Sequence, residues 1–257
     1  MCFDLDSTPP VPSNPEAVAD QRMLTLTSAD GTRFAAFAAL PRERSDVGVV
    51  VLPDVRGLYR FYREIALRLA EAGHPAVAID YYGRTAGVAE RDEDFPFLDH
   101  LLRLTRDGIH TDVAAAIAHL RSDVGGACRR VVTLGFCFGG RQSFLAATRG
   151  HDHLVGVIGY YGLPGYGPDG SPGPTQHAAE MTVPVLALMG GADEVIPPSE
   201  VAAFEEALAA AGVEHEVVTY PGAPHSFFDL KHDGKYAEAS ADSWRRVLDF
   251  LRRCSAA

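Results

Sequence analysis

One short segment of this 257-residue chain has the spacing of a nucleophile held on a sharp turn. Residues 135–139 read Gly-Phe-Cys-Phe-Gly, which is the form G-x-C-x-G with Cys137 at its centre. A turn of this kind joins a strand to a helix and lifts the nucleophile above the sheet. It also directs the side chain toward the N-terminus of the helix, whose free N–H groups and positive dipole favour a thiolate or an oxyanion. Cys137 is therefore the candidate nucleophile.

Two further residues complete a relay for acyl transfer. Asp193 lies in the segment GGADEVIP after one expected strand, and His225 lies in PGAPHSF after the next strand. Reactive groups gather at the carboxyl ends of strands in open parallel sheets, and the order nucleophile, acid, histidine is typical of this turn. We expect Cys137 to attack an acyl carbon, His225 to move the proton, and Asp193 to orient His225.

An oxyanion hole is expected beside the nucleophile. One donor should be the backbone N–H of Phe138, because it follows Cys137 at the start of the helix. The second donor should come from the loop after the first buried strand, at the N–H of Val55. Both donors would stabilise the negative charge of a tetrahedral intermediate.

Each residue of the relay also has a simpler interpretation. Cys137 could be an inert cysteine in a glycine-rich turn, and Asp193 could cap a helix. His225 is one of ten histidines and could be an exposed loop residue. Dinucleotide binding is disfavoured because the spacing G-x-G-x-x-G is absent from the first strand-to-helix turn. Three matches at three strand ends, in the expected order, favour the catalytic interpretation.

The elements that must position these residues alternate along the chain. Apolar runs around Asp30-Gly31 predict a hairpin, and β-branched runs then alternate with helical patterns. Strands are expected at 23–27, 34–40, 47–52, 76–79, 131–134, 154–160, 183–189 and 214–220. Helices are expected at 61–72, 107–121, 139–148, 198–211 and 236–253. This pattern predicts an α/β fold, with a mostly parallel sheet, helices on both faces and an antiparallel N-terminal hairpin.

The remaining segments and the composition narrow the class of protein. Residues 1–20 contain four prolines and are expected to form an arm or a segment that lies along the surface, while 21–257 are expected to form one domain. The pattern leaves the conformation of 81–105 open. The net charge of −11 argues against nucleic acid and anionic membranes as partners. Without a visible signal peptide or paired cysteine motifs, we expect a cytoplasmic protein, monomeric or homodimeric, that acts on a small molecule.

Four segments together resemble the dienelactone hydrolase, or carboxymethylenebutenolidase, family of α/β-hydrolases. They are GFCFGG at 135–140, GGADEVIP at 190–197, PGAPHSF at 221–227 and LPDVRGL at 52–58. The resemblance covers roughly residues 21–253. It implies the α/β-hydrolase fold and hydrolysis of an enol-lactone or related ester without a cofactor.

The resemblance also implies roles for residues around the nucleophile. Members of the family carry a glutamate after the first parallel strand that is linked to thiolate formation, and this chain has the shorter Asp54 there. The alternative for Asp54 is a carboxylate that caps its loop. Arg84 matches one of two arginines that bind the substrate carboxylate, with a solvated surface arginine as the alternative. The position of the second arginine holds Asp229, which should repel an anionic substrate.

Aromatic residues near the expected site could line a substrate pocket. Tyr161 and Phe227 are the candidates, and simple packing is the alternative for each. We therefore expect a lactone or ester hydrolase that forms an acyl-enzyme. A ligand-binding protein without hydrolysis, and a thioesterase or acyltransferase on the same triad, are the alternatives.

Overall fold

The computed structural model describes residues 3–4, 6–92, 94–232 and 234–256. Within them, one eight-stranded sheet has the order β1-β2-β4-β3-β5-β6-β7-β8. Its strands are β1 (Val18–Thr27), β2 (Arg33–Pro41), β3 (Val47–Leu52), β4 (Ala76–Ile79), β5 (Arg130–Phe136), β6 (Leu154–Tyr160), β7 (Val185–Gly190) and β8 (His215–Tyr220). Strand β2 pairs antiparallel with β1 and β4, and the other neighbours pair in parallel. The predicted α/β sheet with its antiparallel hairpin is confirmed.

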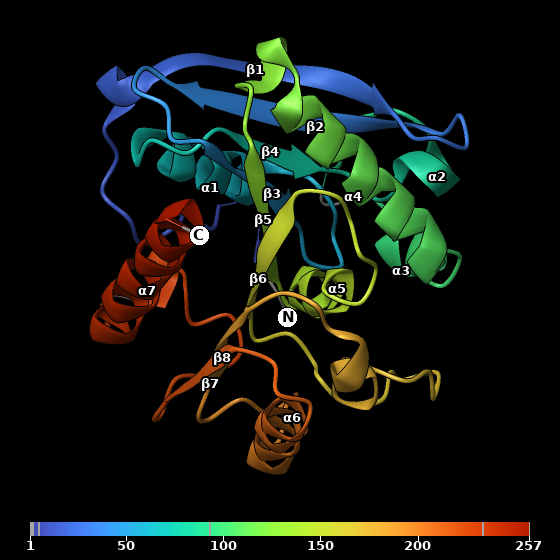
Figure 1. Ribbon diagram of the computed structural model, residues 1–257, viewed down its shortest axis with the longest axis vertical. Helices are drawn as coiled ribbons and strands as arrows, with labels where there is room; N and C mark the ends of the chain where they lie inside the picture. Colours follow the sequence, from blue (N-terminus) through green and yellow to red (C-terminus); the bar gives the residue numbers. More distant parts are fainter. Residues whose placement is uncertain (1–2, 5, 93, 233, 257) are drawn as a thin grey trace.

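Helices cover both faces of this sheet. They are α1 (Arg60–Glu71), α2 (Gly83–Ala86), α3 (Phe97–Leu101), α4 (Arg106–Arg121), α5 (Phe138–Ala146), α6 (Pro198–Ala210) and α7 (Ala237–Ala256). Short 3-10 turns are η1 (Pro15–Ala17), η2 (Asp123–Gly125), η3 (Thr175–Glu180) and η4 (Leu230–His232). Figure 1 shows α1 and α7 on one side of the sheet and α4 and α5 on the other. Every residue of β3 is buried, as a central strand covered on both faces requires.

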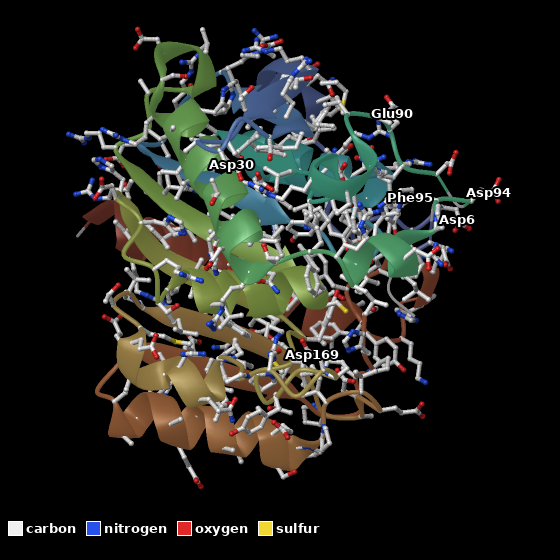
Figure 2. All side chains as sticks on the ribbon, turned by 90° about the vertical axis from the view of Figure 1, so that its right-hand side faces the viewer. Asp6, Asp30, Glu90, Asp94, Phe95 and Asp169 are labelled. Carbon is white, nitrogen blue, oxygen red and sulfur yellow. The ribbon has the colours of Figure 1, made fainter. Side chains whose placement is uncertain are left out.

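The segment 81–105, whose pattern was ambiguous, holds α2 and α3. A buried ion pair fixes it to the sheet: Nε and Nη2 of Arg91 lie 3.0 and 2.8 Å from Oδ2 of Asp80, at the end of β4. The Arg91 guanidinium also lies over the ring of Phe95. In Figure 2, Phe95 and its neighbour Asp94 lie on the same side of the molecule as Asp6.

The N-terminal residues depart from the expected arm. Strand β1 begins at Val18, inside the range assigned to the arm, because its pairing with β2 extends back to Pro41. Phe3 is only 2% exposed and packs into the core. Among the residues that the structure describes, no helix combines the length and apolar character needed to cross a membrane.

Candidate active site

Cys137 lies on a sharp turn between β5 and α5. Its backbone has φ 55° and ψ −115°, a conformation that residues other than glycine rarely adopt. The glycines on either side are required by close backbone contacts. A Cβ at Gly135 would lie 2.0 Å from the carbonyl oxygen of Gly139, and a Cβ at Gly139 would lie 2.0 Å from that of Leu52. The predicted strand–turn–helix geometry is therefore present, and it holds the cysteine at the end of a central strand.

The turn places Cys137 directly before the N-terminus of α5. The N–H of Arg141 donates to the carbonyl of Cys137 at 3.0 Å, which begins the helical pattern of hydrogen bonds. Phe138 is the first residue of this helix, so its N–H has no acceptor within the helix. This is the location expected for an oxyanion donor.

The loops after β7 and β8 bring Asp193 and His225 together. Nδ1 of His225 lies 2.7 Å from Oδ2 of Asp193, and the Asp193 side chain is fully buried. The second oxygen, Oδ1, accepts backbone N–H bonds from Val195 at 2.8 Å and Ile196 at 3.1 Å. These bonds fix the carboxylate, so Oδ2 faces the imidazole. The acid–histidine pair expected from two distant segments is therefore formed.

Strand β6 connects the cysteine turn to the histidine loop. The N–H of Cys137 donates to the carbonyl of Tyr160 at 3.0 Å. The next residue, Tyr161, has its ring centroid 5.0 Å from that of His225. Because β5, β6, β7 and β8 are consecutive neighbours in the sheet, their carboxyl ends place all three candidate residues along one edge.

The loop after β3 contributes a buried carboxyl group. Asp54 is fully buried, its Oδ1 accepts from the N–H of Arg56 at 2.8 Å, and its Oδ2 accepts from the N–H of Phe3 at 3.2 Å. Burial raises the pKa of Asp54 to about 6, although these hydrogen bonds oppose the shift. Burial is also the main reason why the pKa of Tyr81 is raised, and the charges of Asp54 and Cys137 add to it. The Tyr81 hydroxyl donates to the carbonyl of Pro53 at 3.0 Å, in the same loop as Asp54.

Val55 follows in the same loop. Its carbonyl accepts a hydrogen bond from the hydroxyl of Tyr82, which holds the loop against the segment after β4. The role of the Val55 N–H as second oxyanion donor stays a prediction.

Comparison with known proteins identifies the family of this chain. The model of the dienelactone hydrolase family matches residues 34–255. The chain belongs to the dienelactone hydrolase family. A carboxymethylenebutenolidase of Rhodococcus opacus is 30% identical over 275 aligned positions, which cover 98% of this chain and 97% of that protein. The resemblance inferred from the four motifs is confirmed.

Two further relatives support the assignment. A candidate carboxymethylenebutenolidase of Salmonella typhimurium is 33% identical over 236 residues, covering 89% of this chain and 86% of that protein. A candidate dienelactone hydrolase of Klebsiella pneumoniae has a crystal structure that superposes with a TM-score of 0.75 at 26% identity. That alignment covers 91% of this chain and 99% of the other. This member of the dienelactone hydrolase family is therefore a hydrolase with the α/β-hydrolase fold.

In this dienelactone hydrolase family member, two carboxylates of the protein bind the guanidinium of Arg84. Its Nε and Nη2 each lie 2.8 Å from a carboxylate oxygen of Asp112, and its Nη1 lies 2.6 Å from Oδ2 of Asp30. Asp112 is fully buried and also accepts a bond from the hydroxyl of Ser28. Because two carboxylates already bind this guanidinium, the structure does not support its predicted pairing with a substrate.

The two candidate aromatic residues are both fully buried. Phe227 packs against Tyr160, Tyr161 and Tyr220, with ring centroids 5.2–6.1 Å apart. These contacts place it in the aromatic core, so the structure does not support its predicted role in lining a substrate pocket. Tyr161 instead lies beside the His225 ring, where it can restrict the movement of the imidazole. A direct substrate contact by Tyr161 stays a prediction.

Two contacts near the site were not foreseen from the sequence. Phe3 donates its N–H to Asp54, and Oδ1 of Asp229 accepts the N–H groups of Thr8 at 3.2 Å and Lys231 at 3.1 Å. The contact of Phe3 with Asp54 was not predicted because the proline-rich composition of the N-terminal residues indicated an arm. For the contacts of Asp229, the only signal in the sequence was an acidic residue at the position of the second arginine.

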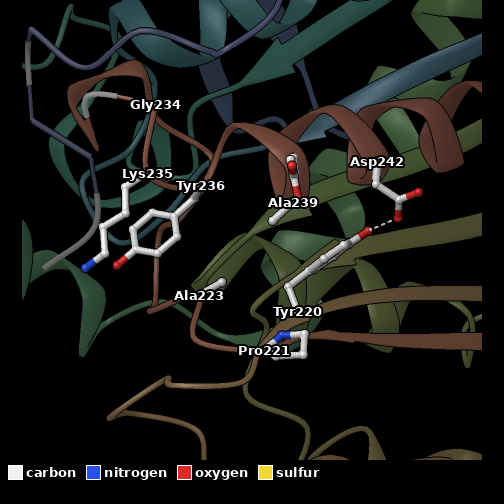
Figure 3. Close-up of a pocket in the computed structure, with 9 residues that line it drawn as sticks. Tyr220, Pro221, Ala223, Gly234, Lys235, Tyr236, Ala239 and Asp242 are labelled. Carbon is white, nitrogen blue, oxygen red and sulfur yellow. Dashed lines mark hydrogen bonds between the residues drawn. The ribbon is translucent and has the colours of Figure 1, made fainter.

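A cavity of about 500 Å³ lies between the end of β8 and the start of α7. Its walls include Tyr220, Pro221, Lys235, Tyr236 and Asp242 (Figure 3), and the Tyr220 hydroxyl donates to Asp242 at 2.9 Å. None of the residues of the predicted relay lines it. This cavity is therefore separate from the candidate active site.

Proposed function

We propose that this protein hydrolyses a carboxylic ester or a lactone through Cys137, His225 and Asp193. The observation that carries the proposal is the 2.7 Å contact between His225 and Asp193 at the same sheet edge as the cysteine turn. A histidine oriented by a buried carboxylate is a general base, and a strained turn at a helix N-terminus suits a nucleophile. Membership in a hydrolase family agrees with this chemistry.

In the first half of the reaction, the sulfur of Cys137 attacks the acyl carbon while its proton passes to His225. The tetrahedral intermediate then collapses, the bond to the leaving oxygen breaks, and the protonated His225 returns its proton to that oxygen. For a lactone the leaving oxygen stays attached to the acyl group. The product is a thioester on Cys137.

In the second half, His225 takes a proton from water, whose oxygen attacks the thioester carbon. The second tetrahedral intermediate releases the thiolate, which regains its proton from His225. A carboxylic acid leaves and the enzyme is restored. Asp193 stabilises the imidazolium in both halves without being protonated itself.

The negative oxygen of each intermediate is assigned to two backbone donors. Phe138 supplies the N–H at the start of α5, and Val55 supplies the N–H of the loop after β3. This arrangement needs donors that are fixed before the reaction. The hydrogen bonds of Tyr82 to the Val55 carbonyl and of Arg56 to Asp54 support a fixed loop.

The charges near the site favour a substrate without a free carboxylate. Arg84 is engaged by Asp112 and Asp30, and an acid occupies position 229. We therefore assign a neutral ester or lactone as the preferred class. The name of the Rhodococcus opacus relative points to a butenolide carrying an acid, which makes dienelactone the comparison substrate.

The test compares wild type with Cys137→Ala, using p-nitrophenyl acetate and dienelactone. Cys137→Ala should no longer hydrolyse either substrate, whereas the matched variant Cys128→Ala should hydrolyse both. Equal rates in wild type and Cys137→Ala would refute the proposal. Mass spectrometry of wild type quenched during turnover should find an added acetyl group on Cys137.

Thiol labelling supplies an independent measurement. Burial raises the pKa of Cys128 and Cys254 to about 11, so at neutral pH only about one thiol in 10⁴ at these positions is a thiolate. Iodoacetamide should therefore modify Cys137 much faster than either of them. Uniform labelling of all three thiols would contradict the assignment of Cys137 as the activated nucleophile.

A further inference from the structure

The N-terminal segment, residues 3–4 and 6–8, lies between the two loops that border the proposed active site. At one end the N–H of Phe3 donates to Oδ2 of Asp54, in the loop after β3. At the other end the N–H of Thr8 donates to Asp229, and the N–H of Leu230 donates to the carbonyl of Thr8 at 3.0 Å. Asp229 lies four residues after His225. The segment thus joins the Asp54 loop to the loop that carries the catalytic histidine.

Charged side chains hold the outer part of this segment. Asp4 lies 3.7 Å from Nη2 of Arg56 and 3.1 Å from Nζ of Lys231. Asp6, which Figure 2 labels at the molecular surface, also pairs with Lys231. Exposed pairs of this kind are individually weak. Here they act on a segment that is also held by backbone hydrogen bonds and by a buried side chain.

That buried side chain is Phe3. Its ring stacks on Phe61 with centroids 3.6 Å apart, and it meets Phe136 and Tyr161 edge-on at 6.0 and 6.3 Å. The hydroxyl of Tyr59 donates to its backbone carbonyl. These neighbours belong to the site: Phe136 directly precedes Cys137, and Tyr161 lies beside the imidazole of His225. The phenyl ring therefore fills a space lined by aromatic residues immediately behind the catalytic groups.

We propose that Phe3 is a positioning and specificity-determining residue of this active site. Its amide holds the Asp54 carboxyl group, and its ring excludes aromatic groups of a substrate from the space between Phe61, Phe136 and Tyr161. Asp229 acts through it by anchoring the segment at Thr8. This inference rests on the proposed ester hydrolysis and names the acyl groups that the site rejects.

The first test measures acyl specificity in Phe3→Ala. Removing the ring opens a space the size of a phenyl group, so p-nitrophenyl phenylacetate should gain over p-nitrophenyl acetate. A single methylene in a hydrophobic pocket changes discrimination by about ten- to 200-fold, and a phenyl group is larger than a methylene. We expect the ratio of the two kcat/KM values to rise at least about tenfold, mainly through a lower KM for the phenylacetate.

Two further variants make this measurement specific. Val124→Ala truncates an exposed apolar side chain on η2 and should keep the wild-type ratio. Asp4→Asn combined with Asp6→Asn removes the surface ion pairs without altering the core, and should raise the ratio about two- to fivefold. If Phe3→Ala does not fold, this double variant decides the question. An unchanged ratio in the variants of the segment would overturn the inference.

A binding measurement separates this inference from the proposed function. Apolar cavities created by truncation bind small aromatic molecules, so benzyl alcohol should raise the Tm of Phe3→Ala but not that of wild type or Val124→Ala. If wild type hydrolyses no ester but benzyl alcohol stabilises Phe3→Ala, the proposed function fails. The Tm shift would still show that the Phe3 ring fills a space that can bind an aromatic group. If Cys137-dependent hydrolysis is found but Phe3→Ala shows neither the altered ratio nor the Tm shift, the inference fails alone.

Discussion

Asp54 makes the stability of this protein depend on pH in an unusual direction. The carboxyl group is fully buried, and burial raises its pKa from 3.8 to about 6. The folded protein therefore retains a proton that the unfolded chain releases. Between pH 4 and pH 6 the folded state binds more protons than the unfolded state, so the free energy of unfolding falls as the pH rises.

The size of this effect follows from the pKa values. A shift of about 2 pKa units corresponds to about 3 kcal/mol once both states are ionised. About 0.6 kcal/mol of this is already lost at pH 4, because the unfolded chain has begun to ionise there. The Asp54 carboxyl should therefore lower the free energy of unfolding by about 2.4 kcal/mol between pH 4 and pH 8.

The substitution Asp54→Asn isolates this contribution. Asparagine cannot ionise, and its single oxygen can accept the N–H of Arg56 or of Phe3 but not both, which imposes a cost at every pH. That cost is a constant offset and does not change the slope. The difference in unfolding free energy, variant minus wild type, should therefore rise by about 2.4 kcal/mol from pH 4 to pH 8.

Urea unfolding followed by circular dichroism at five pH values gives this difference directly. Asp123→Asn, which neutralises an exposed carboxylate on η2, is the control for the loss of one negative charge. A difference for Asp54→Asn that stays flat over this range, or that falls as the pH rises, would show that the folded protein accommodates the charged carboxylate. The argument from burial would then be refuted.

Three further substitutions test the positioning of the site. Gly139→Ala should destabilise the fold by about 4 kcal/mol or more, because its Cβ would overlap a backbone carbonyl; a normal urea midpoint would contradict this. Arg84→Ala should cost about 3–5 kcal/mol by leaving Asp112 buried and unpaired. The kcat/KM of Arg84→Ala for dienelactone should change less than about threefold. A large rise in KM alone would instead show that Arg84 binds the substrate. Asp193→Asn should lower kcat by about 10⁴-fold through the wrong tautomer of His225, with an unchanged circular dichroism spectrum.

The elements that carry the relay could be predicted because their signals are local. The run VGVVVL has the composition of a strand buried on both faces, and β3 has the predicted bounds Val47–Leu52. The spacing G-x-C-x-G reflects contacts within a few residues, and the structure shows the overlap that larger side chains would cause. The pairing of His225 with Asp193 needed one further rule, that parallel strands end at one edge.

The contacts that the sequence did not predict depend on distances between elements. Arg84 pairs with Asp112 on α4 and with Asp30 in the β1–β2 turn. The sequence alone does not predict that these three side chains lie close together. A single arginine after a strand looks the same whether it faces a substrate or two carboxylates. The burial of Phe3 was hidden for another reason: four prolines nearby suggested an arm, whereas the aromatic contacts that hold the ring come from α1, β5 and the end of β6.

The two positions that correspond to the arginines of the family have a common physical property. A site that binds a substrate carboxylate needs an arginine with donors available, yet Arg84 is neutralised by Asp30 and Asp112. At the second position Asp229 accepts the N–H of Thr8, so this carboxylate anchors the N-terminal segment at Thr8. At both positions the charged group is bound by other residues of the protein. Recognition must then depend on shape and apolar contact, which is why we expect Phe3 and the aromatic residues around it to set specificity.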